Sequence, residues 1–220
     1  VRKIDLHELF EFIPGRGGGI CNFGDLIVIA DREGGINAYS LNENKPVYTS
    51  IPNLSGNTEN AKESDQIKIF EVHDIECITS SDGNYIVASH EYFDQAVNAK
   101  RLAISKFQFD YSNVDVNKST WKIIFLSDNW QPLTEINNAG RLLYDDGGKI
   151  IVTIAPLQIN NFDSEFIMDP QSLESQFGKI LRVDINDGKS EVVSYGHRNV
   201  QGLVQTRLGE ILATEHGPLG

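Results

Sequence analysis

Two clusters of polar residues near the C-terminal end of the sequence have the side-chain types of a functional site. The first cluster lies between Gly196 and Gly202. Its members are His197, Arg198, Asn199 and Gln201. The second cluster is Glu215-His216-Gly217-Pro218, which follows a short apolar run. Imidazole, guanidinium and amide groups bind polar ligands, and β-proteins usually carry such groups where strands end and loops begin. We therefore expect both clusters to form one site.

The elements that must position these clusters recur along the chain. Each unit has a turn glycine, followed by a short apolar run that ends near a small or hydroxyl residue. The turn glycines are Gly24, Gly83, Gly148 and Gly209, at spacings of 59, 65 and 61 residues. The runs end near Ala30, Ser89, Thr153 and Thr214. Repeated short strands and turns are typical of β-propeller blades, so we predict an all-β protein.

The repeat predicts a single partial propeller domain over 1–220. We assign blade-like units to about 20–60, 70–110 and 120–187, and an incomplete unit to 190–220. Long polar segments at 42–66 and 155–177 are predicted to be surface loops, where a protein partner could bind. At about 60 residues per blade, the 220 residues hold about three and a half four-stranded blades. That number is too small to close a ring, so we expect a fragment of a larger propeller.

Composition and charge restrict the class of partner. The net charge is −12, and so acidic a surface repels phosphate backbones, which argues against nucleic acid. The longest apolar runs, such as 26–30, are far too short for a transmembrane segment. Cys21 and Cys77 have neither a metal-binding spacing nor a CxxC spacing. A disulfide in an oxidising compartment is one interpretation, but we favour two buried free thiols.

Both polar clusters belong to longer sequence motifs, here called words, that carry a family resemblance. The words are Gly140 to Leu142, Gly178 to Arg182, Gly196 to Leu203 and Glu215 to Pro218. In this order they resemble the glucose/sorbosone dehydrogenase family, whose members are six-bladed β-propellers. The family includes soluble quinoprotein aldose dehydrogenases that use pyrroloquinoline quinone (PQQ) and calcium. The resemblance is firm over roughly 137–220 and weaker over 20–136, and the family usually has proline where this chain has Val200.

The resemblance implies oxidation of a sugar hydroxyl by hydride transfer to the quinone, in the periplasm or outside the cell. Arg198 and Asn199 match residues that contact the cofactor. The guanidinium of Arg198 would act catalytically by stabilising negative charge that develops on a quinone oxygen. His216 matches a residue beside the cofactor plane. Gly217 and Pro218 would offer backbone carbonyls to calcium, a hard cation that takes oxygen ligands and acts as a Lewis acid.

The position of the general base departs from the family pattern. The family has a histidine four residues before the arginine of the word Gly140-Arg141-Leu142, where this chain has Asn137. An amide has no useful basicity near neutral pH. The family's Gly-Asp after the following strand, which orients the base, is replaced by Ala155-Pro156. His90 and His73 are candidate substitutes, although a lone histidine at a strand end is more often structural.

Two functional interpretations therefore stay open. One is a PQQ- and calcium-dependent aldose sugar dehydrogenase that uses an unidentified base. The other is a non-catalytic propeller of the same family that binds a ligand or a protein, which the missing base, the acidic charge and the polar loops favour. The intact words around Arg198 and His216 favour the enzyme, and they argue against a purely structural propeller.

Overall fold

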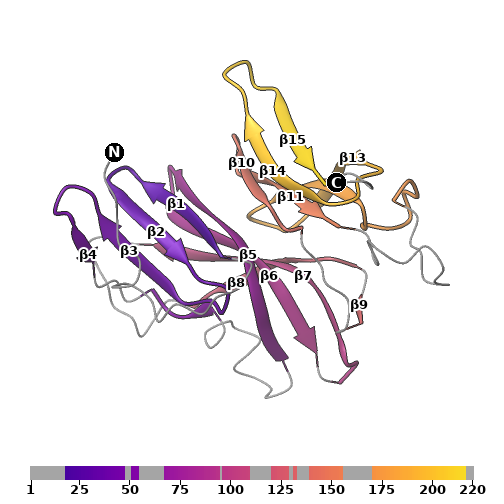
Figure 1. The fold of residues 1–220 in the computed structure, drawn as a ribbon, viewed down its shortest axis with the longest axis horizontal. Coiled ribbons are helices and arrows are strands. Elements are labelled where there is room, and N and C mark those ends of the chain that lie inside the picture. Colours follow the sequence, from indigo (N-terminus) through magenta and orange to yellow (C-terminus); the bar gives the residue numbers. More distant parts are fainter. Residues whose placement is uncertain are drawn as a thin grey trace.

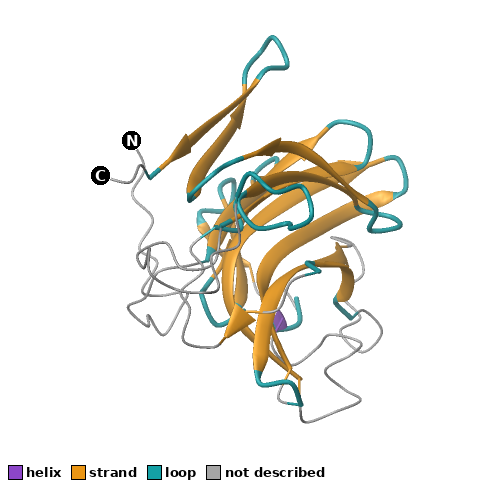
Figure 2. Ribbon diagram, turned by 90° about the vertical axis from the view of Figure 1, so that its right-hand side faces the viewer, coloured by secondary structure: helices purple, strands orange, loops and turns teal. Residues whose placement is uncertain are grey.

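The computed structural model of this protein is built of β-strands (Figure 1). It describes residues 18–47, 51–54, 67–94, 96–109, 120–128, 131–132, 139–155 and 170–216. Within these ranges there are fifteen strands, and the sheets are antiparallel. Figure 2 shows strands and loops with one short helical turn, at Leu54. The predicted all-β class is confirmed. Among the described residues, no helix is long and apolar enough to cross a membrane.

In each of the first two sheets the strands are hydrogen-bonded in the order in which they occur in the chain. The strands of the first sheet are β1 (Gly19–Phe23), β2 (Leu26–Ala30), β3 (Ile36–Ser40) and β4 (Lys45–Val47). Those of the second sheet are β5 (Ile67–Ser80), β6 (Gly83–Asp94), β7 (Ala99–Phe109) and β8 (Lys122–Leu126), with the short β9 (Gln131–Pro132) paired to β7.

The third sheet repeats this order, and a two-stranded sheet follows it. The strands of the third sheet are β10 (Leu142–Asp145), β11 (Lys149–Ile154), β12 (Lys179–Asp184) and β13 (Ser190–Tyr195). The last sheet is the hairpin of β14 (Val200–Gln205) and β15 (Ile211–Glu215). Four-stranded antiparallel sheets in chain order are the arrangement expected of propeller blades.

All four predicted turn glycines lie where the first and second strands of a sheet meet, with Gly83 as the first residue of β6. Their φ angles are 57° at Gly24, 145° at Gly83, 80° at Gly148 and 83° at Gly209. Residues other than glycine rarely adopt positive φ, so glycine is strongly favoured at these four turns. The sequence repeat therefore reflects a repeated backbone conformation.

The sheets divide the chain at positions that differ from the expected unit boundaries. β8, within the range given to the third unit, pairs with β7 and completes the second sheet. β13, within the range given to the fourth unit, pairs with β12 and completes the third sheet. Both are outermost strands, and their sequences carry little sign of which sheet they join.

The segment 42–66, expected to be a surface loop, is partly ordered into the first sheet. β4 lies within it and pairs with β3. Ile51 and Leu54 are buried in the hydrophobic core between the first two sheets. In the other predicted loop, 155–177, Phe177 is buried against the third sheet. Apolar residues spaced along these polar segments anchor them to the sheets.

Hydrophobic side chains fill the spaces between neighbouring sheets. One cluster, which includes Val28 and Ile75, joins the first and second sheets. A second, which includes Ile78 and Ile150, joins the second and third. A smaller cluster around Val200 joins the third sheet to the last hairpin. The first strands also follow one another in space, because β1 contacts β5, β5 contacts β10, and β10 contacts β14. This succession gives the sheets a common inner edge.

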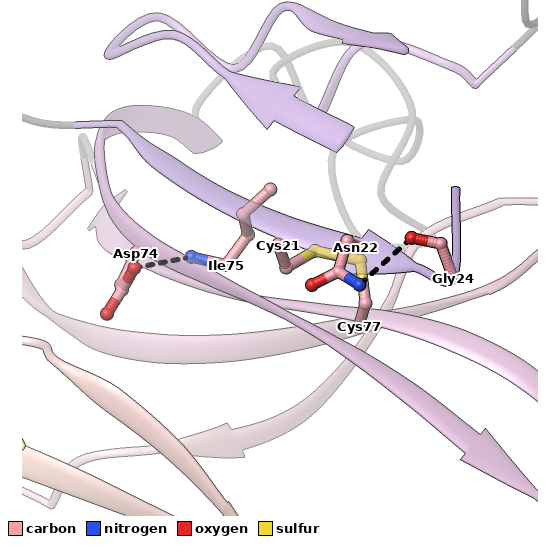
Figure 3. Close-up of a disulfide and its surroundings, with 6 residues drawn as sticks. All are labelled: Cys21, Asn22, Gly24, Asp74, Ile75 and Cys77. Atoms are coloured by element: carbon pink, nitrogen blue, oxygen red, sulfur yellow. Dashed lines mark hydrogen bonds between the residues drawn. A yellow bond between two sulfur atoms is a disulfide. The ribbon is translucent and has the colours of Figure 1, made fainter. Parts of the chain in front are cut away.

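Cys21 and Cys77 form a disulfide, so the preference for free thiols is wrong (Figure 3). The two cysteines are 56 residues apart in sequence, but β1 and β5 lie side by side, and the Cα atoms are 5.4 Å apart. That distance is within the usual range for a disulfide. The bond joins the first strands of two neighbouring sheets.

Candidate functional site

The structure brings the two polar clusters into direct contact. Nη1 of Arg198 donates a hydrogen bond to the carbonyl oxygen of His216 at 3.1 Å. The main-chain N–H of His216 donates to the carbonyl oxygen of Asn199, also at 3.1 Å. The main-chain N–H of Arg198 donates to Oε2 of Glu215 at 3.1 Å. Residues separated by a whole hairpin in sequence therefore lie side by side.

The register of the last hairpin explains this contact. β14 and β15 are antiparallel, and Val200 is opposite Glu215. The residues before β14 and those after β15 must then lie at the same end of the hairpin. A register shift between Val200 and Gly202 forms a bulge at Gln201. Bulges re-aim side chains, and here the Gln201 side-chain amide donates to Oδ1 of Asn199.

Glu215 is the electrostatic centre of the contact. Its Oε2 accepts the N–H of Arg198 and lies 3.4 Å from Nδ1 of His197. Nε2 of His197 is 2.7 Å from the hydroxyl of Ser194. The side chain of Asn199 is buried, whereas His216 is exposed. The site thus combines a buried asparagine, an exposed histidine and a partly exposed arginine.

A buried lysine anchors the loop that carries Arg198. Gly196 donates its N–H to the carbonyl of Pro170 at 2.9 Å, and His197 donates to the carbonyl of Gly178 at 3.0 Å. Nζ of Lys179 donates to the same Pro170 carbonyl at 2.6 Å and to a second carbonyl at 2.7 Å. Lys179 is fully buried. These two hydrogen bonds hold the support of the loop in place.

The neighbouring sheet contributes the next part of the same edge. Oγ1 of Thr153, at the end of β11, accepts the N–H groups of Gly140 at 3.1 Å and Arg141 at 3.0 Å. The same hydroxyl lies 3.3 Å from the carbonyl oxygen of Val200, to which it donates. The start of β10 and the start of β14 are therefore connected through one side chain.

A comparison with protein families identifies the family of this chain. A family model described as Glucose / Sorbosone dehydrogenase matches residues 27–220, which is most of the chain. This chain belongs to the glucose/sorbosone dehydrogenase family. A protein of Synechocystis sp. (strain ATCC 27184 / PCC 6803 / Kazusa), described as uncharacterized, is 28% identical to this family member over 161 residues. The match covers 64% of this chain and 36% of the Synechocystis protein, so the chain corresponds to about a third of that relative's length.

Three of the site positions expected for a glucose/sorbosone dehydrogenase lie outside the described residues: Asn137, Gly217 and Pro218. The described residues closest in sequence to Asn137 are Ala139 and Gly140. Gly140 has a φ of 104° and packs on His73, whose ring atoms would lie 2.9 Å from a Cβ placed there. His73 is therefore located directly beneath the start of β10.

His90 lies on β6, away from solvent, in this family member. It is fully buried, with Nε2 2.8 Å from the hydroxyl of Ser105 and Nδ1 3.1 Å from the carbonyl oxygen of Glu91. Burial lowers the pKa of His90 to about 4. A ring with both nitrogens engaged and so low a pKa is a poor acceptor for a substrate proton near neutral pH.

His73, like His90, is buried in surroundings that lower its pKa, but its Nε2 differs in its hydrogen bonding. Its Nε2 is buried and has no hydrogen-bond partner among the described residues. Burial lowers the pKa of His73 to about 3, with further contributions from His90, Lys100 and Arg141. The ring is therefore neutral at physiological pH, and its low basicity disfavours a role as general base.

Two carboxylates on β5 complete the inner edge. Oδ2 of Asp74 accepts the N–H of Leu142 at 3.1 Å, and the carboxylate of Glu76 accepts the N–H of Tyr144. Arg141 is 3.7 Å from Asp74. Burial raises the pKa of Asp74, and burial together with the charge of Asp74 raises the pKa of Glu76 to about 7. β10 is an edge strand, and these two carboxylates accept main-chain N–H groups on its outer side.

The described residues contain no group of three or more His, Cys, Asp or Glu side chains placed to hold a metal ion. The predicted calcium ligands are backbone carbonyls of Gly217 and Pro218, so the calcium prediction stays a prediction. Arg198 and His216 already share a hydrogen bond next to that segment.

The sequence analysis gave no role to Glu215 or Lys179. Both residues stand inside words that were quoted for the family resemblance. Their contacts depend on hairpin register and on the packing of Pro170 under β12, neither of which can be read from the sequence. The only available signal was the presence of charged residues within those words.

Proposed function

We propose that this protein is a PQQ- and calcium-dependent aldose sugar dehydrogenase-like member of its family. The observation that carries the proposal is the hydrogen bond between Arg198 and His216, which unites the two clusters at one end of the last hairpin. The set of donors suits an anionic planar cofactor, because it combines a guanidinium, an imidazole and the amide of Asn199.

The roles of the chain's own residues follow from this placement. A bound quinone would supply the hydride acceptor, and calcium held by the carbonyls of Gly217 and Pro218 would supply a Lewis acid. Arg198 would stabilise negative charge on an oxygen of the bound group. Asn199, held by Gln201 and buried, would orient the loop and donate an amide hydrogen bond. The hydrogen bonds of Lys179 would hold the support of this loop before any ligand binds.

Proton removal from the sugar hydroxyl is the unassigned step. Asn137 occupies the base position and has no useful basicity. His90 and His73 have pKa values of about 4 and about 3. These values favour the second candidate function, a non-catalytic propeller of the same family that binds a ligand or a protein partner.

The test for turnover uses the full-length gene product with PQQ and calcium. A sugar-dependent bleaching of a redox dye would establish the dehydrogenase. Restoring a base with Asn137→His should raise the rate by about a hundred- to ten-thousand-fold if the site is intact. Thr79→Val, at an exposed position on β5, serves as a control that should leave the rate unchanged.

The possible outcomes separate the two candidates. Quinone binding without turnover, followed by activity in Asn137→His, would identify a dehydrogenase that has lost its base. Quinone binding with no activity in either protein would favour the binding module. An absence of quinone binding would refute the cofactor proposal.

We also propose a location outside the cytoplasm. The disulfide between Cys21 and Cys77 supports it, because such bonds form and persist in oxidising compartments. An acidic protein there would meet sugars rather than nucleic acid. Secretion of the full-length product, measured by cell fractionation, tests this location.

A further inference from the structure

We propose that Glu215 is a positioning residue that fixes the main chain of Arg198 against the end of β15. The inference rests on the proposed function, because that function makes Arg198 a cofactor-binding residue. Glu215 would then set the orientation of that residue. Its starting point is the oxygen Oε2, which lies 3.1 Å from the Arg198 nitrogen and 3.4 Å from Nδ1 of His197.

Among the described residues, three hydrogen bonds join residues 198–199, before β14, to residues 215–216 at the end of β15. Glu215 accepts one of them through its side chain. The bond from His216 to Asn199 joins two main-chain atoms. The bond from Arg198 to His216 uses the guanidinium that we assign to the cofactor. Replacing Glu215 therefore tests the connection without removing a group that would touch the quinone.

Hairpin geometry explains why this residue is suited to the task. Glu215 is the last residue of β15 and stands opposite Val200, the first residue of β14. Its carboxylate reaches back across the hairpin end to the residues just before β14. The acceptor satisfies a main-chain donor that would otherwise have to find another partner. The main chain of Arg198 therefore keeps one orientation.

The predicted consequence is coupling between the carboxylate of Glu215 and ligand binding at Arg198. Without the carboxylate, the Arg198 backbone gains freedom that a ligand would have to remove on binding. We expect Glu215→Ala to weaken PQQ binding by about tenfold, within the usual range of coupling between linked sites. Glu215→Gln retains an oxygen that can accept the Arg198 N–H, so it should stay within about threefold of the natural protein.

The experiment uses the full-length protein and two independent measurements. Amide hydrogen exchange of Arg198, followed by NMR, reports the hydrogen bond directly, and titration calorimetry with PQQ and calcium reports affinity. Glu210→Ala is the matched control, because Glu210 is an exposed residue in the turn of the same hairpin. Glu215→Ala should increase exchange at Arg198 and weaken PQQ binding, whereas Glu215→Gln and Glu210→Ala should change neither strongly.

Different failures have different meanings. Unchanged exchange at Arg198 in Glu215→Ala would overturn the positioning role, whatever happens to affinity. An equal effect of Glu210→Ala would also overturn it, because the effect would then belong to the hairpin as a whole. If the natural protein binds no PQQ, the proposed function fails, and the exchange measurement alone decides the role of Glu215.

Discussion

Glu76 shows how a single side chain responds to its position on the inner edge. It lies on β5 with its carboxylate turned to the N–H of Tyr144, two residues from Asp74. Burial first, and then the negative charge of Asp74, raise its pKa from 4.5 to about 7. A carboxyl group with such a pKa is partly protonated at neutral pH.

The shift predicts a specific dependence of stability on pH. Between pH 4.5 and about 7 the folded state holds a proton that the unfolded state has released, so stability falls as the pH rises through this window. The glutamine of Glu76→Gln cannot ionise, so the variant should not lose this part of its stability as the pH rises. The free energy of unfolding of the variant relative to the natural protein should therefore rise by about 2 to 3 kcal/mol from pH 4.5 to pH 8.

Urea unfolding at several pH values measures this difference. Glu210→Gln, at an exposed carboxyl, is the control and should follow the natural protein. A constant difference between Glu76→Gln and the natural protein over the whole pH range would contradict the assigned pKa.

At the residue scale, the sequence predicted side chains but not their connections. Arg198 and His216 were identified because they belong to recognisable motifs. In the structure the guanidinium of Arg198 donates to the carbonyl oxygen of His216. His90 attracted attention as a strand-end histidine, but its location in the core depends on the length of the second sheet. β5, β6 and β7 have 14, 12 and 11 residues, longer than the apolar runs that were visible in the sequence.

At the scale of elements, hydroxyl residues at the ends of second strands connect neighbouring sheets. The hydroxyl of Ser89, on β6, donates to the carbonyl of Gly140 at the start of the third sheet. Thr153, on β11, makes the equivalent bond to Val200 in the fourth. The sequence analysis noted that apolar runs end near such residues. For Ser89 and Thr153 the structure provides the reason, because the hydroxyl of each satisfies a carbonyl of the next sheet.

Thr153→Val tests this connection with little change in shape. The substitution removes one donor and the acceptor of two main-chain N–H groups, all of them buried or partly buried. Leaving buried polar groups unsatisfied should lower the free energy of unfolding by about 1 to 3 kcal/mol. Chemical denaturation measures the loss.

Thr79→Val makes the same chemical change at an exposed position on β5. Its effect should stay within about 0.5 kcal/mol, as for most surface substitutions. If both variants lose the same stability, the cost comes from the substitution itself and not from the bond between sheets.

At the scale of the whole molecule, the repeat in the sequence predicted the fold because it marks local turns. Gly24 and Gly209 could be found by spacing, since a positive φ restricts the residue type. The assignment of β8 and β13 to sheets could not, because outer strands are short and partly exposed. The pairing of Cys21 with Cys77 was missed for a related reason: it depends on the packing of β1 against β5, and neither strand encodes its neighbour.

That disulfide makes a prediction about the cohesion of the first two sheets. In the chain-entropy model, a bond across 56 residues restricts the unfolded chain enough to contribute about 4 kcal/mol to stability. The double variant Cys21→Ala/Cys77→Ala should lose stability of this order, measured by urea unfolding under oxidising conditions. The natural protein should lose a similar amount in reductant, and the double variant should not respond to reductant. A response of the double variant, or equal stability of both proteins without reductant, would show that packing between β1 and β5 holds the sheets together without the covalent bond.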